Sequence, residues 1–176
     1  AQLYEGGIRV PMIVRWPGVV AEGGTSGVPV TSVDFFPTFL ELSGKPASRD
    51  AVIDGVSLAS LFRGGPAAKR DAIFWHYPHY HAAGINGPAG AVRAGDWKLV
   101  EYYETTLTGK GAPTELFNLR EDPAETRNLA SSEPRRVAEL GERLRAWRAA
   151  VGAQMPTVNP NYDPAKAKTK GAGGKD

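Results

Sequence analysis

An apolar stripe near the end of the 176-residue chain constrains the fold more than any other feature of the sequence. Apolar side chains recur there at steps of three and four: Val137, Leu140, Leu144, Trp147 and Val151. This spacing predicts an amphipathic helix over 131–152. Because a helix of this kind depends on burial of its apolar face, the chain must supply a surface that covers the stripe.

A small sheet is the expected partner of this helix. Residues 72–77 read as a buried strand, and 91–93 and 97–103 flank a turn at 94–96. In the second arm of the hairpin, alternation puts Trp97, Leu99 and Glu101 on one face and Lys98, Val100 and Tyr102 on the other. Residues 114–119 complete an antiparallel meander, and 104–113 should form a flexible tip.

The first part of the chain has a different pattern. A β-branched run predicts a strand around Pro11–Arg15, and a helix should begin near Thr31 or Ser32 and end at Gly44. A shorter helix follows Asp54. We expect three regions: 1–45 as the end of a large catalytic domain, 46–152 as a C-terminal subdomain, and 153–176 as a disordered tail.

Composition excludes several classes of function. The chain has no cysteine, so it can form neither a disulfide nor a thiolate metal site. A formal net charge of +2 is too small to suggest nucleic acid as a partner. No apolar run approaches the roughly 20 residues that span a bilayer, so no membrane association is expected.

Five motifs in order carry a family resemblance. They are YEGGIRVPMIVRWPG, VTSVDFFPTFLELSG, DGVSLASLFRG, AVRAGDWKLVEYY and LFNLREDPAETRNLA, and they cover about residues 3–150. The series resembles the C-terminal portion of sulfatases of the arylsulfatase type, in the alkaline-phosphatase superfamily. The resemblance implies an α/β fold whose C-terminal part holds a small antiparallel sheet packed by a long helix.

The resemblance also implies a reaction that this chain cannot complete alone. Sulfatases use a formylglycine made from Cys or Ser in a C/S-x-P-x-R motif, together with Ca²⁺, and these would lie ahead of Tyr4. A catalytic lysine would fall immediately before Ala1. Ser132–Arg136 matches S-x-P-x-R literally, but Arg135 stands where the family has a small residue, and Ser132 reads as a helix cap. We therefore assign no catalytic residue and no metal ligand to the chain.

The three histidines form the best candidate site. His76, His79 and His81 fall within six residues and, with Tyr80, could bind a sugar or aryl group of the substrate. A metal cluster is an alternative, although its spacing is loose and no carboxylate is near. In a purely structural reading, His76 is a hydrogen-bonded residue of a buried strand and the others are solvated.

Two further pairs of charged residues have two readings each, and a third set of polar residues has a structural one. Glu5 and Arg9 could fix the position of the expected lysine, or simply pair with each other. Arg93 and Lys98 could meet an anionic substrate, although solvated charges are more common on such a hairpin. Asp122, Glu125 and Asn128 are expected to satisfy backbone groups before the last helix.

These observations lead to one hypothesis and its alternatives. The chain is expected to be the C-terminal fragment of a sulfuric ester hydrolase acting on a sulfated small molecule or glycan, inactive alone, from a periplasmic or secreted parent. The alternatives are a non-catalytic binding module that reuses the fold and a fragment of a related phosphatase or phosphonate hydrolase.

Overall fold

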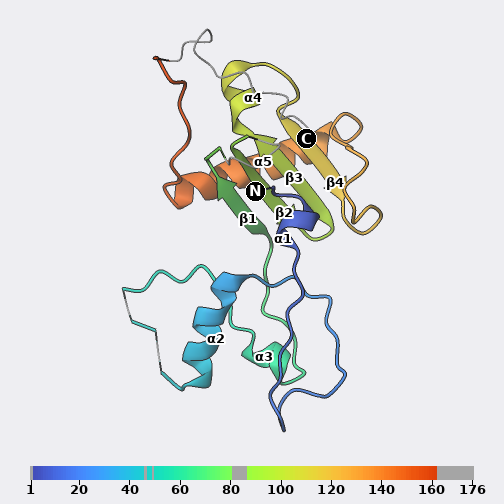
Figure 1. Ribbon diagram of the computed structural model, residues 1–176. Helices are drawn as coiled ribbons and strands as arrows, with labels where there is room; N and C mark the ends of the chain where they lie inside the picture. The colour runs from blue at the N-terminus through green and yellow to red at the C-terminus, as the bar shows by residue number, and fades with distance from the viewer. Residues whose placement is uncertain (1, 46, 49, 81–86, 162–176) are drawn as a thin grey trace, which may run out of the picture. The chain divides into compact units, whose positions relative to one another are not determined.

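The computed structural model describes residues 2–45, 47–48, 50–80 and 87–161 (Figure 1). The chain forms two compact units, one made of residues 1–5 with 74–176 and the other of residues 6–73. The first contains the sheet and is called the sheet unit. The second is called the helical unit. The domain boundaries predicted at 45 and 152 concern a larger enzyme and stay predictions.

The sheet unit is built on four strands in the order β1-β2-β3-β4. The strands are β1 (Ile73–Tyr77), β2 (Ala89–Ala94), β3 (Trp97–Tyr102) and β4 (Thr114–Asn118). β2 pairs antiparallel with β3, and β3 with β4, in a register that places Leu99 opposite both Val92 and Leu116. The predicted meander is therefore confirmed.

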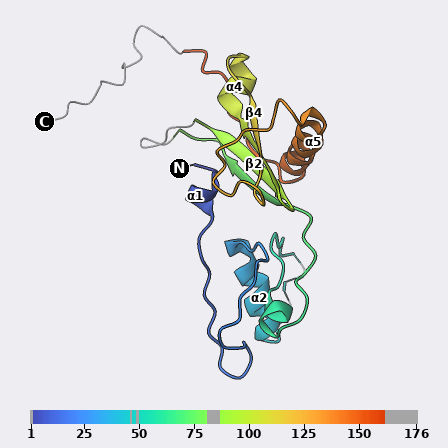
Figure 2. The same cartoon turned by 90° about the vertical axis from the view of Figure 1, so that its right-hand side faces the viewer.

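One face of the sheet is covered by α5 (Pro134–Ala150), as Figure 2 shows. Leu140 and Leu144 of the helix are buried with Leu99 of β3. Phe74 of β1 stacks on Trp147 with ring centroids 4.9 Å apart. The apolar stripe therefore has the partner that its spacing requires.

The opposite face is covered in part by the first residues of the chain. Here alternation along the strands brings small and aromatic side chains together, and Leu3 and Tyr4 pack against them. The buried members of this cluster are Ala89, Ala91, Val100, Phe117 and Leu119. Tyr4 meets Phe117 edge-on at 6.0 Å between ring centroids. Residues 3–5 are thus an integral layer of the sheet unit.

The helical unit contains η1 (Ser32–Asp34), α2 (Phe35–Leu42) and α3 (Ala59–Phe62). Gly44 follows α2 with φ 66°, the left-handed conformation of a helix C′ residue, as predicted. α1 (Glu5–Ile8) begins on the last residue of the sheet unit. Within the described residues, no helix combines the length and apolarity of a membrane span.

Three local expectations were wrong. Residues 11–15 form no strand in the described part of the chain, and Ile13 is 91% exposed, because a strand requires a hydrogen-bonding neighbour. The expected flexible tip contains α4 (Tyr103–Thr108), which ends at Gly109 with φ 68°. Ser132 does not cap α5: the N-cap is Glu133, and the Ser132 hydroxyl donates to the Leu129 carbonyl.

Candidate functional site

The Asp-x-x-Pro-Thr motif and the DG-x-SL motif meet in the helical unit. Asp34 is fully buried, and its carboxylate accepts hydrogen bonds from the N–H of Thr31 and of Val56 at 2.8 and 3.0 Å, and from Arg70. Thr38 accepts the N–H of Leu58 at 2.9 Å. The residues at the start of α2 thus hold the backbone of the DG-x-SL motif in place, and this role is structural.

Hydrogen bonds outweigh burial in setting the pKa of Asp34. Burial would raise the pKa of this carboxyl, but the hydrogen bonds from Arg70, Thr31 and Val56 together hold the pKa below its usual value. The close packing of Val56 against Asp34 also explains the glycine before it. A Cβ at Gly55 would lie 2.1 Å from the backbone oxygen of Val33. Both motifs therefore identify a packing arrangement.

The Asp-Pro-x-Glu-x-x-Asn-Leu-Ala signature also satisfies backbone groups, as predicted. Asn128 Oδ1 accepts the N–H of Leu116 on β4 and the N–H of Ala130. Asp122 accepts the Arg127 N–H at 2.8 Å, and this bond is the main cause that lowers the pKa of Asp122. The signature thus joins the turn before α5 to the edge of the sheet.

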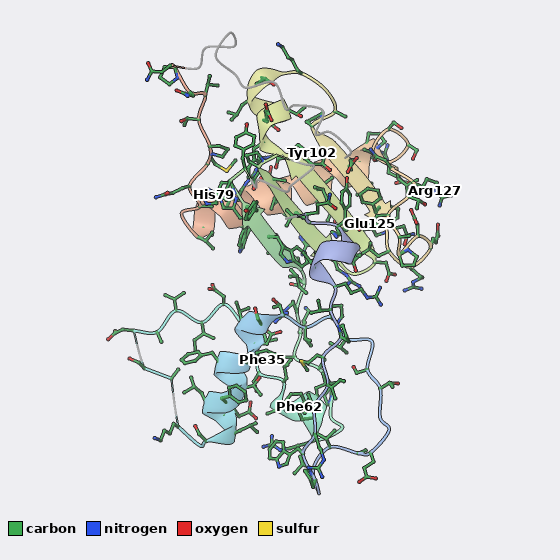
Figure 3. All side chains as sticks on the ribbon, viewed as in Figure 1. Phe35, Phe62, His79, Tyr102, Glu125 and Arg127 are labelled. Carbon is green, nitrogen blue, oxygen red and sulfur yellow. The ribbon has the colours of Figure 1, made fainter. Side chains whose placement is uncertain are left out.

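Glu125 of this signature has a further role that the sequence did not reveal. Lys98, fully buried on β3, lies 2.8 Å from Glu125 Oε1 and 3.1 Å from Glu5 Oε1. The backbone N–H of Glu5 donates to Glu125 Oε2 at 2.5 Å, so Glu125 lies beside the start of α1 (Figure 3). Arg93 lies 3.8 Å from Glu5 Oε2. These four residues are called the ionic cluster.

The ionic cluster changes how two predicted residues are read. Lys98 is not a solvated charge, because its side chain is inaccessible and lies between two carboxylates. Glu5 is buried and pairs with Lys98 and Arg93, while Arg9 is exposed in the helical unit. The expectation that Glu5 and Arg9 fix the position of a catalytic lysine stays a prediction.

Two tyrosines share one carboxylate beside the ionic cluster. The hydroxyls of Tyr4 and Tyr102 both donate to Glu115 Oε2, at 2.5 and 2.7 Å. Burial, followed by the hydrogen bonds that join Tyr102 to Tyr4 and to Glu115, raises the pKa of Tyr102 far above its usual value. The N-terminal segment is therefore attached to the sheet at two successive residues.

His76 belongs to a hydrogen-bonded chain on the α5 face of the sheet. Its Nε2 lies 2.9 Å from the Gln154 carbonyl, which can only accept, so Nε2 carries a proton. In the neutral ring, Nδ1 then accepts from the Tyr103 hydroxyl at 2.7 Å. Arg148, paired with Glu101 at 2.9 Å, lies with its guanidinium over the Tyr103 ring, 5.3 Å from the ring centroid. Both ring nitrogens of His76 therefore have partners within the protein.

Burial is the main cause of the raised pKa of Tyr103, and the hydrogen bond from Arg148 opposes it. Burial alone would lower the pKa of Arg148, but its bonds to Tyr103 and Glu101 raise it instead. The Tyr103 hydroxyl is thus a neutral link between a cation and an imidazole.

The structure separates the predicted site residues. His76 points to the α5 face, and its strand neighbour Tyr77 to the other, where His79 packs edge-on against it at 5.7 Å. His79 and Tyr80 are exposed, Tyr80 to 71% (Figure 3 labels His79). His81 lies outside the described residues. Their role in substrate binding stays a prediction.

Sequence reasoning missed the partners of Lys98 and of Tyr103, because these partners are far away in the chain. Residues 5 and 98 are 93 positions apart, and residues 76 and 103 are 27 apart. One signal was available: two acidic residues, Glu5 and Glu125, sit in family motifs where neither caps a helix. An acidic residue without a local role is a candidate for a distant ion pair.

Comparison with known proteins identifies the origin of this arrangement. Residues 1–150 match the family described as N-sulphoglucosamine sulphohydrolase, C-terminal. Arylsulfatase D of Homo sapiens is 35% identical over 185 residues, covering 89% of this chain and 29% of that protein. A sulfatase of Formosa agariphila is 32% identical over 156 residues, covering 82% and 28%. The chain thus spans under a third of the length of these relatives.

Solved structures agree with the sequence relatives. BT4656, solved in complex with its substrate D-glucosamine-2-N,6-O-disulfate, superposes with a TM-score of 0.61 at 27% identity, over 78% of this chain and 27% of that one. A putative sulfatase from Bacteroides thetaiotaomicron gives 0.56 at 24% identity and shares the fold. The chain belongs to the sulfatase family, of which it is a C-terminal portion with the alkaline-phosphatase-like fold.

Proposed function

We propose that this chain is the C-terminal part of an enzyme that hydrolyses sulfate esters. The observation that carries the proposal is the family match over residues 1–150, which takes in all five motifs. Support comes from the relatives, which are named arylsulfatases and a steryl-sulfatase. In this part of the enzyme the motifs build the scaffold, and the chemistry belongs to the remainder.

The chain itself does not fit the cofactors of the family. It contains no cysteine from which formylglycine could form, and the serine motif Ser132–Arg136 has Arg135 where the family has a small residue. Within the described residues no three His, Asp or Glu side chains are grouped as metal ligands. Formylglycine and Ca²⁺ would therefore be held by the rest of the enzyme. The 176-residue chain alone is expected to have no turnover.

The proposed substrate is a sulfated carbohydrate. Support comes from BT4656, whose substrate is a disulfated glucosamine. In this chain the loop after β1 offers exposed imidazole and phenol groups, His79 and Tyr80, which can donate hydrogen bonds to sulfate or hydroxyl oxygens. His81, which lies outside the described residues, belongs to the same proposal, and His76 would anchor the strand from which the loop leaves.

The test uses the product of the complete reading frame. Formylglycine content is measured by mass spectrometry, and sulfate release from disulfated glucosamine and from 4-nitrophenyl sulfate is measured by ion chromatography. We expect release from both, and for His79→Ala a raised KM on the sugar only. A formylglycine-containing product that releases no sulfate from either compound would refute the proposal.

The matched control is Arg120→Met, on an exposed residue that pairs with Asp96. This variant should leave both kcat and KM unchanged. If His79→Ala behaves like the control, the loop after β1 does not bind the sugar, although the enzyme can still be a sulfatase.

A further inference from the structure

The ionic cluster invites a functional explanation because its composition is costly. Lys98 and Glu5 are buried, and so is the Glu125 carboxylate, at 2% exposure. Taking such ions out of water costs several kcal/mol each, and well-packed apolar residues are often as stable. What an ion cluster adds is geometry: Lys98 and Glu125 fix Glu5 at both its carboxylate and its backbone N–H.

Backbone strain at Glu125 supports the same reading. Its φ is 56°, a positive value found among the described residues at no other position except glycines. The left-handed conformation costs a non-glycine residue about 1 kcal/mol or more, and it persists only where the surroundings enforce it. Here it directs the Glu125 carboxylate toward Lys98 and the N–H of Glu5.

The cluster acts at a specific place in the chain. Leu3 and Tyr4 are packed on the sheet, Tyr4 is bonded to Glu115, and Glu5 is the last residue of the sheet unit before Gly6 begins the helical unit. The ionic cluster therefore holds the segment 2–5 at the point where the chain leaves the sheet.

We propose that Lys98 is a positioning residue of the sulfatase reaction, acting through Glu5 and Glu125 to fix the segment 2–5. This rests on the proposed function, in which the part of the enzyme that supplies the chemistry is joined to the sheet through that segment. Lys98 touches no substrate. Its loss removes the cation that the Glu5 and Glu125 carboxylates share, leaves Glu5 paired with Arg93, and releases the segment.

The first experiment needs no activity. Amide hydrogen exchange of the 176-residue chain is followed by NMR for Lys98→Met, for Glu125→Gly and for the control Arg120→Met. Glycine is chosen at 125 because it accepts φ 56° without strain, so the carboxylate is removed and the backbone kept. The Glu5 amide should exchange at least tenfold faster in both cluster variants. Because Lys98→Met also destabilises the whole sheet unit, the comparison with β3 is made in Glu125→Gly, where the β3 amides should exchange less than twofold faster.

Two results overturn the proposal at this stage. One is an unchanged rate at the Glu5 amide, and the other is an equal acceleration at Glu5 and throughout β3 in Glu125→Gly, which indicates only a less stable sheet. If Lys98→Met does not fold, Glu125→Gly decides alone. The hydrogen-exchange experiment does not depend on whether the enzyme is a sulfatase.

The second experiment measures kcat and KM in the complete enzyme. A small displacement of groups remote from the chemistry can lower the rate up to about a hundredfold. Lys98→Met should therefore lower kcat at least tenfold with KM within threefold. Lys98→Arg, which can still bond both carboxylates, should recover most of kcat. A normal kcat in Lys98→Met overturns the positioning role even if the exchange result is as expected.

Discussion

Gly90 and Tyr103 provide the sharpest test of the packing described above. A Cβ added at Gly90 of β2 would lie 2.1 Å from the Tyr103 hydroxyl oxygen, 3.0 Å from Cζ of that ring and 3.2 Å from the Trp75 carbonyl oxygen. Overpacking of this kind costs about 3 kcal/mol. Gly90→Ala should therefore destabilise the sheet unit by about that amount and break the hydrogen bond between Tyr103 and His76.

Tyr103→Phe removes the atom that the new methyl group would strike. Alone it leaves His76 Nδ1 without its hydrogen-bond partner, at a cost of about 2 kcal/mol. In the double variant, the nearest contact of the methyl group relaxes from 2.1 to 3.0 Å. The double variant should therefore lose about 3 kcal/mol instead of the additive 5 kcal/mol.

Urea unfolding followed by tryptophan fluorescence measures these changes. Three of the four tryptophans, Trp75, Trp97 and Trp147, lie in the sheet unit, so the series is made in a Trp16→Phe background. The control is Tyr102→Phe on the opposite face, which should cost about 1 kcal/mol or less because Glu115 keeps Tyr4. Additive losses in the double variant would refute the contact on which the argument depends.

Three further outcomes are expected. Lys98→Met should destabilise the sheet unit by about 3–5 kcal/mol, and neutralising Glu5 and Glu125 to Gln in the same chain should restore most of it, measured by urea unfolding. Gly55→Ala should abolish the ordered structure of the helical unit, seen as collapsed NMR shift dispersion, because the three atoms nearest to its Cβ are backbone atoms of Val33 and Asp34 at 2.1 to 2.8 Å. The lowered pKa of Asp34 contributes stability above about pH 4 that is lost as the pH falls through the folded-state value, so acid should open the helical unit, and Asp34→Asn should remove this dependence in hydrogen exchange.

The sheet was predictable because its signal is local. The alternation of Trp97, Leu99 and Glu101 against Lys98, Val100 and Tyr102 gave the two faces of β3 correctly, since a period of two leaves no other assignment. The stripe of α5 was equally local. The predicted start of the helix was wrong, because Ser132 resembles an N-cap in the sequence, while in the structure Pro134 is the first residue of α5.

The ion pairs were not predictable in the same way. Lys98 in a half-exposed hairpin is indistinguishable from a solvated lysine until Glu5 and Glu125 are brought to it from distant positions. The histidines show how little closeness in sequence says about side-chain direction, and their role in substrate binding stays a prediction. Their closeness in sequence suggested one pocket, but His76 and Tyr77 occupy successive strand positions and so point to opposite faces.

The order in which the two faces of the sheet are covered has a consequence for biosynthesis. Residues 3–5 emerge from the ribosome before every element they will pack on, and Glu125 is made 120 residues after Glu5. At 5–20 residues per second, roughly 6–24 seconds pass between the synthesis of Glu5 and that of Glu125, which accepts its backbone N–H. During that interval Tyr4 and its apolar neighbours are uncovered and accessible to chaperones. They are covered only after the final strand and helix have been made.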